Sequence, residues 1–287
     1  MIDLEDPRFV ERLRARDERA FNDLVRASER RVYGLVFRML GRRDESEDLT
    51  QEVFVQVFKA IDQFRGDSKL STWIYRIAVN LTKNRTKYNA RRHAGEQDDV
   101  ADTEGHAAFQ EARGVTASDV ARPDEAYDGH EVEGVVQRCI ASLEPDFREV
   151  LVLRDVEGLS AEEAAKVVGI EVGALKSRLH RARLDMREHL IALLGEADSV
   201  SGAPPCPELQ GRLSEYTASD IDQATCAAIE AHLQECPRCK TACDSLRRSV
   251  SLCRQIPGDS VPKAVRAAVR HALHEALATT GGSPTSS

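Results

Sequence analysis

Apolar residues recur at intervals of three and four positions along the first part of the chain. In residues 20–41 and 48–61 this spacing places the apolar side chains on one face of an α-helix. No stretch alternates cleanly between apolar and polar residues, as a half-buried strand would. We therefore expect an all-α fold, in which the apolar positions of these two helices are Phe21, Leu24, Val25, Val32, Leu35, Val36, Leu40, Leu49, Val53, Val57 and Ile61.

A third helix is expected after the loop FRGDSKLS at residues 64–71, with Ser71 as its N-cap. The first half of this helix is apolar and its end is basic, with Lys83, Arg85 and Lys87. Trp73, near its start, is expected to pack in the core. A basic helix end suits a solvated face as well as contact with nucleic acid, so this segment alone leaves both interpretations open.

A sharper pattern lies at residues 159–190, LSAEEAAKVVGIEVGALKSRLHRARLDMREHL. It predicts a short helix from Ala161, a turn at residues 169–170 and a second helix from about Val172, which together make a helix-turn-helix. The second helix carries several basic residues and no acidic residue before Asp185. Such a helix suits the major groove of DNA, where Lys and Arg reach phosphates and guanine edges. An amphipathic helix with one solvated face is the alternative.

Charge is distributed unevenly along the 287 residues, which carry a net charge of −8. Residues 1–93 contain 20 Lys and Arg against 15 Asp and Glu, whereas residues 94–134 contain 12 acidic and only 2 basic residues. The acidic segment is polar and aperiodic, which predicts a flexible linker between folded units. The overall acidity is thus mostly a property of the linker, and it does not exclude a nucleic-acid partner.

Several classes of protein are excluded by what the sequence lacks. No apolar run approaches the roughly 18 residues of a membrane-spanning helix, and the start MIDLEDP lacks the features of a signal peptide. We therefore expect a cytoplasmic chain without membrane contact. No nucleophile and base pair, phosphate-binding loop or paired carboxylates stand out, so we expect no enzyme. Six of the seven Cys follow residue 200, which in a reducing compartment favours metal or redox chemistry over structural disulfides.

A resemblance to the extracytoplasmic-function sigma factors, the smallest initiation subunits of bacterial RNA polymerase, covers about residues 8–90 and 130–192. The segments that carry it are DESEDLTQEVFVQVFKAIDQF, STWIYRIAVN and SLEPDFREVLVLRDVEGLSAEEAAKVVGIEVGALKSRLHRAR. The resemblance implies a helical domain that docks on the clamp helices of core RNA polymerase and opens the minus-ten promoter element. It also implies that the helix-turn-helix reads the minus-thirty-five element of promoter DNA.

The resemblance also assigns roles to single residues. The loop at residues 65–71 corresponds to one that captures a flipped base. Leu49 and Phe54 suit the core as well as they suit the polymerase contact. Polymerase contact is implied for Asp48, Leu49, Gln51, Glu52 and Phe54, and DNA contact is expected for Asn80, Lys83, Asn84, Arg85, Lys176, Ser177, Arg178, His180, Arg181 and Arg183.

The last part of the chain, with CPELQGRLSEY and AIEAHLQECPRCKTACDSL, resembles zinc-binding anti-sigma domains. The resemblance implies four metal ligands, Cys206, His232, Cys236 and Cys239. His232 and Cys236 are four residues apart, so they share one side of a helix. Three Cys and one His suit a closed tetrahedral zinc site. The family's acidic-glycine segment after the Tyr is replaced here by TASDI, residues 217–221.

The ligand pattern leaves alternatives open. Buried reduced thiols are one alternative to a metal site. The three extra thiols, Cys226, Cys243 and Cys253, are compatible with ligand exchange, a disulfide or a softer ion such as Cu(I). Residues 260–280, SVPKAVRAAVRHALHEALATT, carry one apolar stripe and are too short and too charged to span a membrane.

The expected organisation therefore has five parts. We expect a cis-acting metal- or redox-responsive domain that contacts the sigma domains, and the sequence does not fix whether it inhibits or activates. A polymerase-independent DNA-binding regulator and a metal-buffering protein are the alternatives to a sigma factor. The parts are residues 1–93 (sigma domain 2), 94–134 (acidic linker), 135–194 (sigma domain 4), 195–255 (anti-sigma-like zinc-binding domain) and 256–287 (short helix and disordered tail).

Overall fold

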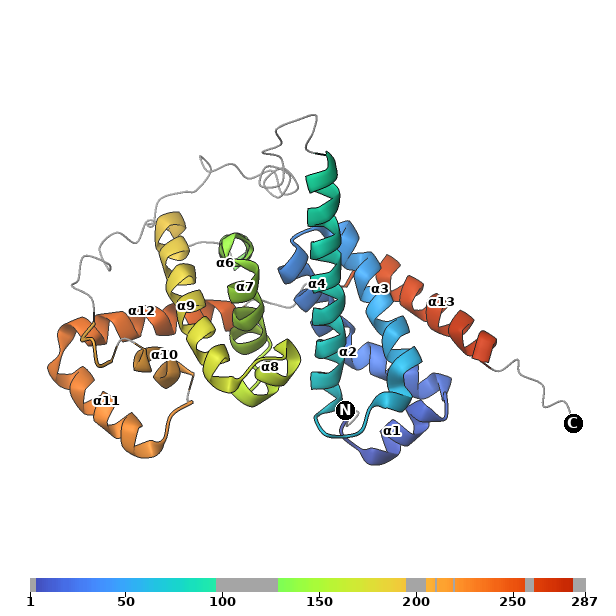
Figure 1. The fold of residues 1–287 in the computed structure, drawn as a ribbon, viewed down its shortest axis with the longest axis horizontal. Helices are drawn as coiled ribbons and strands as arrows, with labels where there is room; N and C mark the ends of the chain where they lie inside the picture. The colour runs from blue at the N-terminus through green and yellow to red at the C-terminus, as the bar shows by residue number, and fades with distance from the viewer. Residues whose placement is uncertain are drawn as a thin grey trace, which may run out of the picture. The chain divides into compact units, whose positions relative to one another are not determined.

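The structure is a computed structural model that describes residues 4–96, 129–194, 205–209, 211–218, 220–255 and 261–280 (Figure 1). Every regular element in these ranges is helical, which confirms the predicted all-α fold. The chain forms two compact units. Unit 1 combines residues 1–103 with residues 258–287, and unit 2 comprises residues 104–257.

Unit 1 begins with a short helix and continues with three longer ones that pack on one another. Asp17 caps α2, because its carboxylate accepts hydrogen bonds from the backbone N–H groups of Arg19 and Ala20. Gly41 ends α2 in the left-handed conformation, with φ 73°. The elements are α1 (Pro7–Arg14), α2 (Glu18–Leu40), α3 (Arg43–Ala60), the 3₁₀ turn η1 (Ile61–Gln63) and α4 (Leu70–Glu96).

The core of unit 1 lies between α2, α3 and α4. The rings of Phe21 and Phe58 meet there with their centroids 4.9 Å apart. The predicted apolar faces of α2 and α3 point into this core, as their buried positions match the helical spacing. Buried side chains include Leu24, Val32, Leu35, Val36, Leu49, Val53, Val57, Ile61, Leu70, Ile74 and Ala78.

The start of α4 differs from the prediction. The helix begins at Leu70, so Ser71 lies in its first turn and is not the N-cap. The backbone N–H of Leu70 donates instead to the carboxylate of Glu5, 3.2 Å away. A side chain from the beginning of the chain thus binds the N-terminus of α4, which sequence spacing around Ser71 does not reveal. Trp73 is half-buried and packs on Phe64, with ring centroids 5.5 Å apart.

The last helix, α13 (Lys263–Thr280), also belongs to unit 1 and packs along α3 and against α2 (Figure 1). Val265, Val269 and Leu273 face the contact and are buried. Arg266 lies beside this stripe and forms an ion pair with Glu29 of α2, with 2.7 Å between Nε and Oε1. The predicted apolar stripe therefore covers another part of the same chain.

Unit 2 contains the helix-turn-helix. Ser160 and Glu163 form a capping box at the start of its first helix, and Gly169 ends that helix with φ 80°. The predicted start at Ala161, the turn and the second helix from Val172 are confirmed. The elements are α6 (Gly129–Ser142), α7 (Pro145–Leu151), the π-helical turn η3 (Val152–Val156), α8 (Ala161–Val168) and α9 (Val172–Leu194).

The remainder of unit 2 is a small helical segment that packs on α9 and η3. Its elements are α10 (Arg212–Thr217), α11 (Gln223–Glu235) and α12 (Pro237–Gln255). We call residues 205–255 the Cys-rich segment, and this segment together with α13 the tail. Leu184 of α9 packs against the small core of the Cys-rich segment, whose buried members are Leu209, Leu213, Ile229, Cys239, Cys243 and Leu246.

The predicted acidic linker lies mostly outside the described residues, in the gap 97–128. Its described ends are helical, because residues 94–96 belong to α4 and residues 129–134 belong to α6. The boundaries between the five predicted parts stay predictions. Among the described residues, none of the helices is long and apolar enough to cross a membrane.

Candidate functional site

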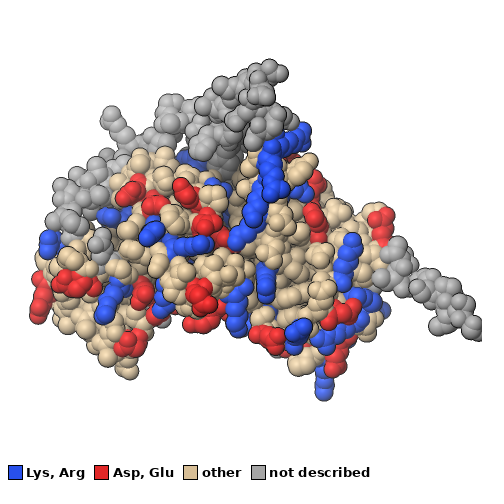
Figure 2. All heavy atoms as spheres, in the orientation of Figure 1, with Lys and Arg blue, Asp and Glu red and all other residues tan. Residues whose placement is uncertain are grey.

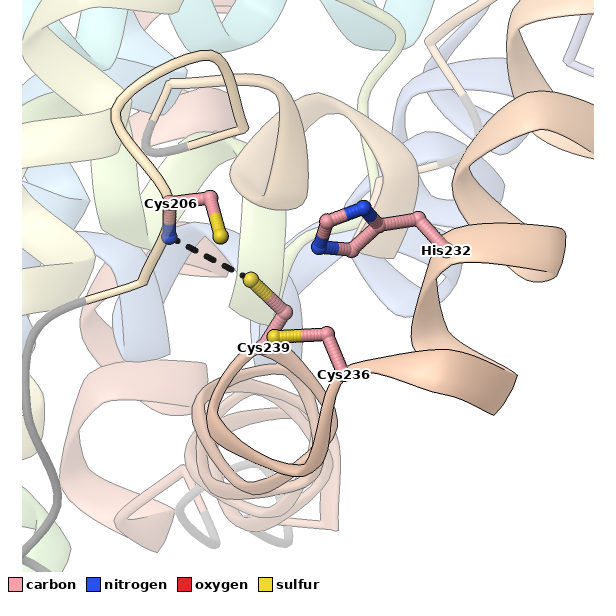
Figure 3. A group of neighbouring side chains, drawn as sticks. All are labelled: Cys206, His232, Cys236 and Cys239. Atoms are coloured by element: carbon pink, nitrogen blue, oxygen red, sulfur yellow. Dashed lines mark hydrogen bonds between the residues drawn. The ribbon is translucent and has the colours of Figure 1, made fainter.

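The four expected metal ligands lie together in the Cys-rich segment (Figure 3). His232 comes from the last turn of α11, Cys236 follows that helix as its C-cap, and Cys239 lies in the first turn of α12. Cys206 comes from the segment before α10, and its backbone N–H donates to Cys239 Sγ at 3.3 Å. The end of α11, the start of α12 and the non-helical segment before α10 therefore bring the four side chains together.

The arrangement of donor atoms fits a metal ion. The ligand atoms of Cys206, His232, Cys236 and Cys239 all lie within 4.8 Å of one another. Sulfur donors bound tetrahedrally at about 2.3 Å from zinc are about 3.8 Å apart, so a shift of about 1 Å closes the site. His232 Nε2 is buried and has no hydrogen-bond partner among the described residues, as expected of a nitrogen that serves as a metal ligand.

The thiols of the site differ in acidity. The backbone N–H of Cys239 stabilises the Cys236 thiolate and lowers the pKa of Cys236 to about 6, and the nearby side chains of the other three ligands lower it further. Burial raises the pKa of Cys239 to about 11. One thiol is therefore largely ionised at neutral pH before any metal arrives, which suits the deprotonated state that metal binding requires.

The three extra thiols do not belong to this group of four. Cys226 is half-buried on α11, and its Sγ lies 3.5 Å from Glu230 Oε1. Cys243 and Cys253 are buried on α12, and Cys243 is part of the small core of the Cys-rich segment. Ligand exchange or disulfide formation by these thiols stays a prediction.

The residues expected to grip polymerase divide into two sets. Asp48 and Glu52 are exposed on α3, and Gln51 is half-buried. Leu49 and Phe54 are each only 1% exposed, so in this conformation they pack in the core of unit 1. Of the two roles that the sequence left open for these side chains, this conformation matches packing in the core. Polymerase contact stays a prediction for Asp48, Gln51 and Glu52.

The residues of α4 expected to meet DNA lie on or near its surface. Asn80 and Asn84 are exposed, and Lys83 and Arg85 are half-buried. Arg85 Nη2 lies 3.4 Å from Glu52 Oε2 of α3, so a predicted DNA contact and a predicted polymerase contact form an ion pair. Figure 2 shows Lys and Arg side chains over the face of α4 turned to the viewer; the exposed ones on this helix include Arg76, Lys87 and Arg91.

The basic residues of the helix-turn-helix have different environments. Ser177 and Arg181 are exposed, whereas Lys176, Arg178 and His180 are half-buried. Arg178 pairs with Asp146 of α7, with 3.2 Å between Nη1 and Oδ2. Burial lowers the pKa of His180, and the charges of Arg183 and Arg181 lower it further.

Arg183 is placed differently from the prediction. It is 1% exposed, and its guanidinium forms a two-point ion pair with Asp155 of η3, at 2.8 and 2.5 Å. Its Nη1 also donates to the Ser214 carbonyl of α10 at 2.5 Å. In this conformation Arg183 is a buried link between the helix-turn-helix and the Cys-rich segment, and it is not available to DNA.

The chain matches three family models in sequence order. Residues 24–92 match Sigma-70 region 2, residues 133–186 match Sigma-70 region 4, and residues 206–240 match the family described as "Putative zinc-finger". RNA polymerase sigma-H factor of Pseudomonas aeruginosa is 36% identical over 196 residues, which cover 67% of this chain and 97% of that protein. Two further relatives are ECF RNA polymerase sigma-E factors, from Haemophilus influenzae and Escherichia coli strain K12. Both are 37% identical over 180 residues, which cover 63% of this chain and 92% and 91% of those proteins. The chain belongs to the extracytoplasmic-function sigma factors.

Membership in this family decides among the functions that the sequence left open. A sigma factor is an initiation factor that binds core RNA polymerase and promoter DNA, and it is not an enzyme. The polymerase-independent regulator is therefore not favoured. In this sigma factor the region 4 match contains α8 and most of α9, and the zinc-finger match contains all four candidate ligands.

Two residues of this sigma factor near the helix-turn-helix were missed by the sequence analysis. Arg154 of η3 and Asp220, in the segment before α11, form an ion pair with 2.5 Å between Nη2 and Oδ2. Lys176 Nζ donates to the backbone carbonyl of Asp220 at 3.0 Å. Arg154 lies outside the reading helix and Asp220 lies 66 positions further along the chain. The only available signal was the TASDI segment, where the sequence departs from the pattern of zinc-binding anti-sigma domains.

Proposed function

We propose that this sigma factor is inhibited in cis by its own tail, which binds one zinc ion, and that loss of zinc or oxidation of its ligands relieves the inhibition. The observation that carries the proposal is that the tail packs on both promoter-reading parts of the chain. The Cys-rich segment packs on α9 within unit 2, and α13 packs on α3 within unit 1.

Support from unit 2 comes from the side chains that join the Cys-rich segment to α9. Arg183 donates to Ser214, and Arg187 Nε donates to Ser245 Oγ at 2.7 Å. Leu184 packs on the core of the segment. These contacts occupy one face of the helix that is expected to enter the major groove, and they include a basic residue predicted to bind DNA.

Support from unit 1 comes from the position of α13. This helix packs along α3, the helix that carries the predicted contacts Asp48, Gln51 and Glu52 with core polymerase. Val269 of α13 is 1% exposed, which supports close packing of this helix within unit 1. A docked α13 reduces the area of α3 that remains available to a partner.

Zinc is proposed because of the donor set. Three thiols and one imidazole within a 4.8 Å cluster suit the closed, four-coordinate site that zinc adopts in structural positions. The core of the Cys-rich segment is small, so the metal contributes much of its folding free energy. Removing the metal should therefore loosen the contacts with α9.

In vitro transcription with core RNA polymerase tests the proposal. The template is a promoter selected from genomic fragments that the holoenzyme transcribes. The full chain and the variant Cys236→Ser with Cys239→Ser are compared, and Cys226→Ser is the control because its thiol lies outside the cluster. Inhibition in cis predicts higher unstimulated transcription from the double variant alone.

Two results would contradict the proposal in different ways. Low transcription from the double variant under all conditions would mean that the metal-bound tail activates. Equal transcription and equal metal content in all three proteins would mean that the cluster is only part of the fold. A chelator or an oxidant added to the unmodified chain provides an independent comparison, and both treatments should raise its transcription.

A further inference from the structure

An acidic residue of the tail lies against two basic residues, one just before the helix-turn-helix and one within it. Arg154 precedes α8, and its guanidinium donates through Nη1 to the Leu159 carbonyl next to the α8 N-cap. Through Nη2 it binds the Asp220 carboxylate at 2.5 Å. Lys176, in the second turn of α9, reaches the carbonyl of the same Asp220. Two positive side chains, one near the start of each helix, therefore converge on one residue of the tail.

The position of this pair matches a general feature of DNA binding. In a helix-turn-helix the second helix enters the major groove while the first crosses the DNA backbone. Phosphates beside the groove are bound by Arg, Lys and helix N-termini, and these contacts fix the orientation of the protein. Arg154, held beside the N-terminus of α8, and Lys176, near the start of α9, have the charge and the placement that such a phosphate contact needs.

The burial of Arg154 and Asp220 indicates what happens to this site when the tail departs. The side chain of Arg154 is 8% exposed and that of Asp220 is 16% exposed. Asp220 belongs to the Cys-rich segment, so departure of this segment removes the carboxylate that Arg154 binds. Two acidic residues remain in the first turn of α8: Glu162, which is exposed, and Glu163, which belongs to the capping box. A partly buried guanidinium that loses its carboxylate favours a replacement anion.

We propose that Arg154 and Lys176 form a DNA-phosphate site on the helix-turn-helix, and that Asp220 occupies this site as a substitute for the phosphate while the tail is docked. This inference rests on the proposed inhibition in cis and names the contact through which the tail and promoter DNA compete. The proposal also gives the TASDI segment a role, because this segment supplies the acidic residue Asp220.

Binding of the full chain to a fluorescein-labelled DNA duplex of about 30 base pairs and arbitrary sequence tests the proposal by fluorescence anisotropy. Asp220→Asn removes the carboxylate charge but keeps the backbone carbonyl that Lys176 binds. Asp244→Asn is the matched control, because Asp244 is exposed on α12 and its loss changes the net charge equally. We expect Asp220→Asn to raise the affinity about tenfold and Asp244→Asn to change it less than about twofold.

Second substitutions then identify the groups that bind the phosphate. Adding Arg154→Gln or Lys176→Gln to Asp220→Asn should reverse the gain and lower the slope of log K against log salt by about 0.9 for each lost phosphate contact. Adding Lys240→Gln, a change at an exposed position of α12, should do neither. The salt slope reports phosphate contacts whether or not the tail stays folded, and metal content measured in parallel shows whether it does.

The proposal is overturned if Asp220→Asn and Asp244→Asn raise the affinity equally, since the effect is then one of net charge. It is also overturned if the affinity and the salt slope are unchanged by Arg154→Gln and Lys176→Gln. Failure of the proposed function gives a different result, because it appears as an unaltered transcription level in the ligand variants. The two failures are therefore distinguishable.

Discussion

Arg266 of α13 and Glu29 of α2 form an ion pair in which Nε lies 2.7 Å from Oε1, and the Glu29 side chain is only 12% exposed. This pair fixes the position along α2 at which the last helix docks. Because an ion pair of this partly exposed kind contributes at most about 1 kcal/mol, most of the docking free energy must come from the apolar stripe. Burial of one Val side chain contributes about 1.5–3 kcal/mol.

The first prediction concerns that stripe. Val269→Asp places a charge in the buried contact, so α13 should detach and its backbone amides should lose protection in hydrogen exchange. Ala267→Asp introduces the same residue at an exposed position and should leave the protection intact. Equal protection in the two variants would show that α13 does not depend on this contact.

The second prediction concerns the buried pair of Arg183 and Asp155, both of which are 1% exposed. Asp155→Ala leaves a buried guanidinium without its carboxylate and should lower the free energy of unfolding of unit 2 by about 3–5 kcal/mol. Asp146→Ala removes the exposed partner of Arg178 and should cost less than about 1 kcal/mol. Exchange rates of the slowest amides of α9 measure both changes, and similar costs would mean that the buried pair is not needed for stability.

The third prediction concerns the polymerase surface. Because Phe54 is buried, a change there tests the fold, and the exposed residues Asp48 and Glu52 are the better targets. In the background of Cys236→Ser with Cys239→Ser, Asp48→Ala with Glu52→Ala should weaken binding to core RNA polymerase about tenfold, or about 1.4 kcal/mol.

Glu11→Ala with Asp44→Ala is the control for this measurement, since it removes the same charge from exposed positions of α1 and α3. Its affinity for core polymerase should match that of the background. If both pairs weaken binding equally, net charge and not a specific surface controls the interaction, and the assigned contact is wrong.

The fourth prediction concerns metal content. The full chain should bind about one zinc ion, and Cys236→Ser with Cys239→Ser should lose it, because two of four ligands are gone. Cys226→Ser should retain the metal. Elemental analysis of the purified proteins measures the zinc-to-protein ratio, and retention of a full equivalent by the double variant would place the ligands elsewhere.

The fifth prediction concerns thiol reactivity in the metal-free chain. A pKa of about 6 leaves the Cys236 thiol mostly ionised at pH 7, whereas burial raises the pKa of Cys139 to about 12 and keeps it protonated. Iodoacetamide at pH 7 should therefore label Cys236 first and Cys139 last, as read by mass spectrometry. Because the thiolate is the reactive form, the rate at Cys236 should fall as the pH drops below about 6, and a rate that stays constant down to pH 5 would contradict this.

Local signals explain which parts of the structure were predictable. The helix-turn-helix follows from Ser160, Glu163 and Gly169, because a capping box and a left-handed glycine act on their own immediate neighbours. His232, Cys236 and Cys239 are likewise placed by helix geometry over a few residues. These elements needed no knowledge of distant contacts.

The remaining features depend on residues far apart in the sequence. Glu5 binds the start of α4, and the partner of α13 lies more than two hundred positions earlier in the chain. Arg183 looked like a DNA contact because its neighbours are basic, but Asp155 and Ser214 make it a buried link. Periodicity reports which face of a helix is apolar, and it does not report which distant element that face covers.

Residues 256–262 connect α12 to α13 along the chain. The two parts of the tail, one in each unit, are therefore covalently linked. In the proposed inhibition in cis, inhibitor and target share a chain, so their ratio is fixed at one to one however strongly the gene is expressed. Return to the inhibited state after a stimulus is a first-order event whose rate does not depend on protein concentration. A sigma factor built in this way resets itself equally fast in a cell with few copies and in a cell with many, and its inhibitor is not titrated away by other sigma factors.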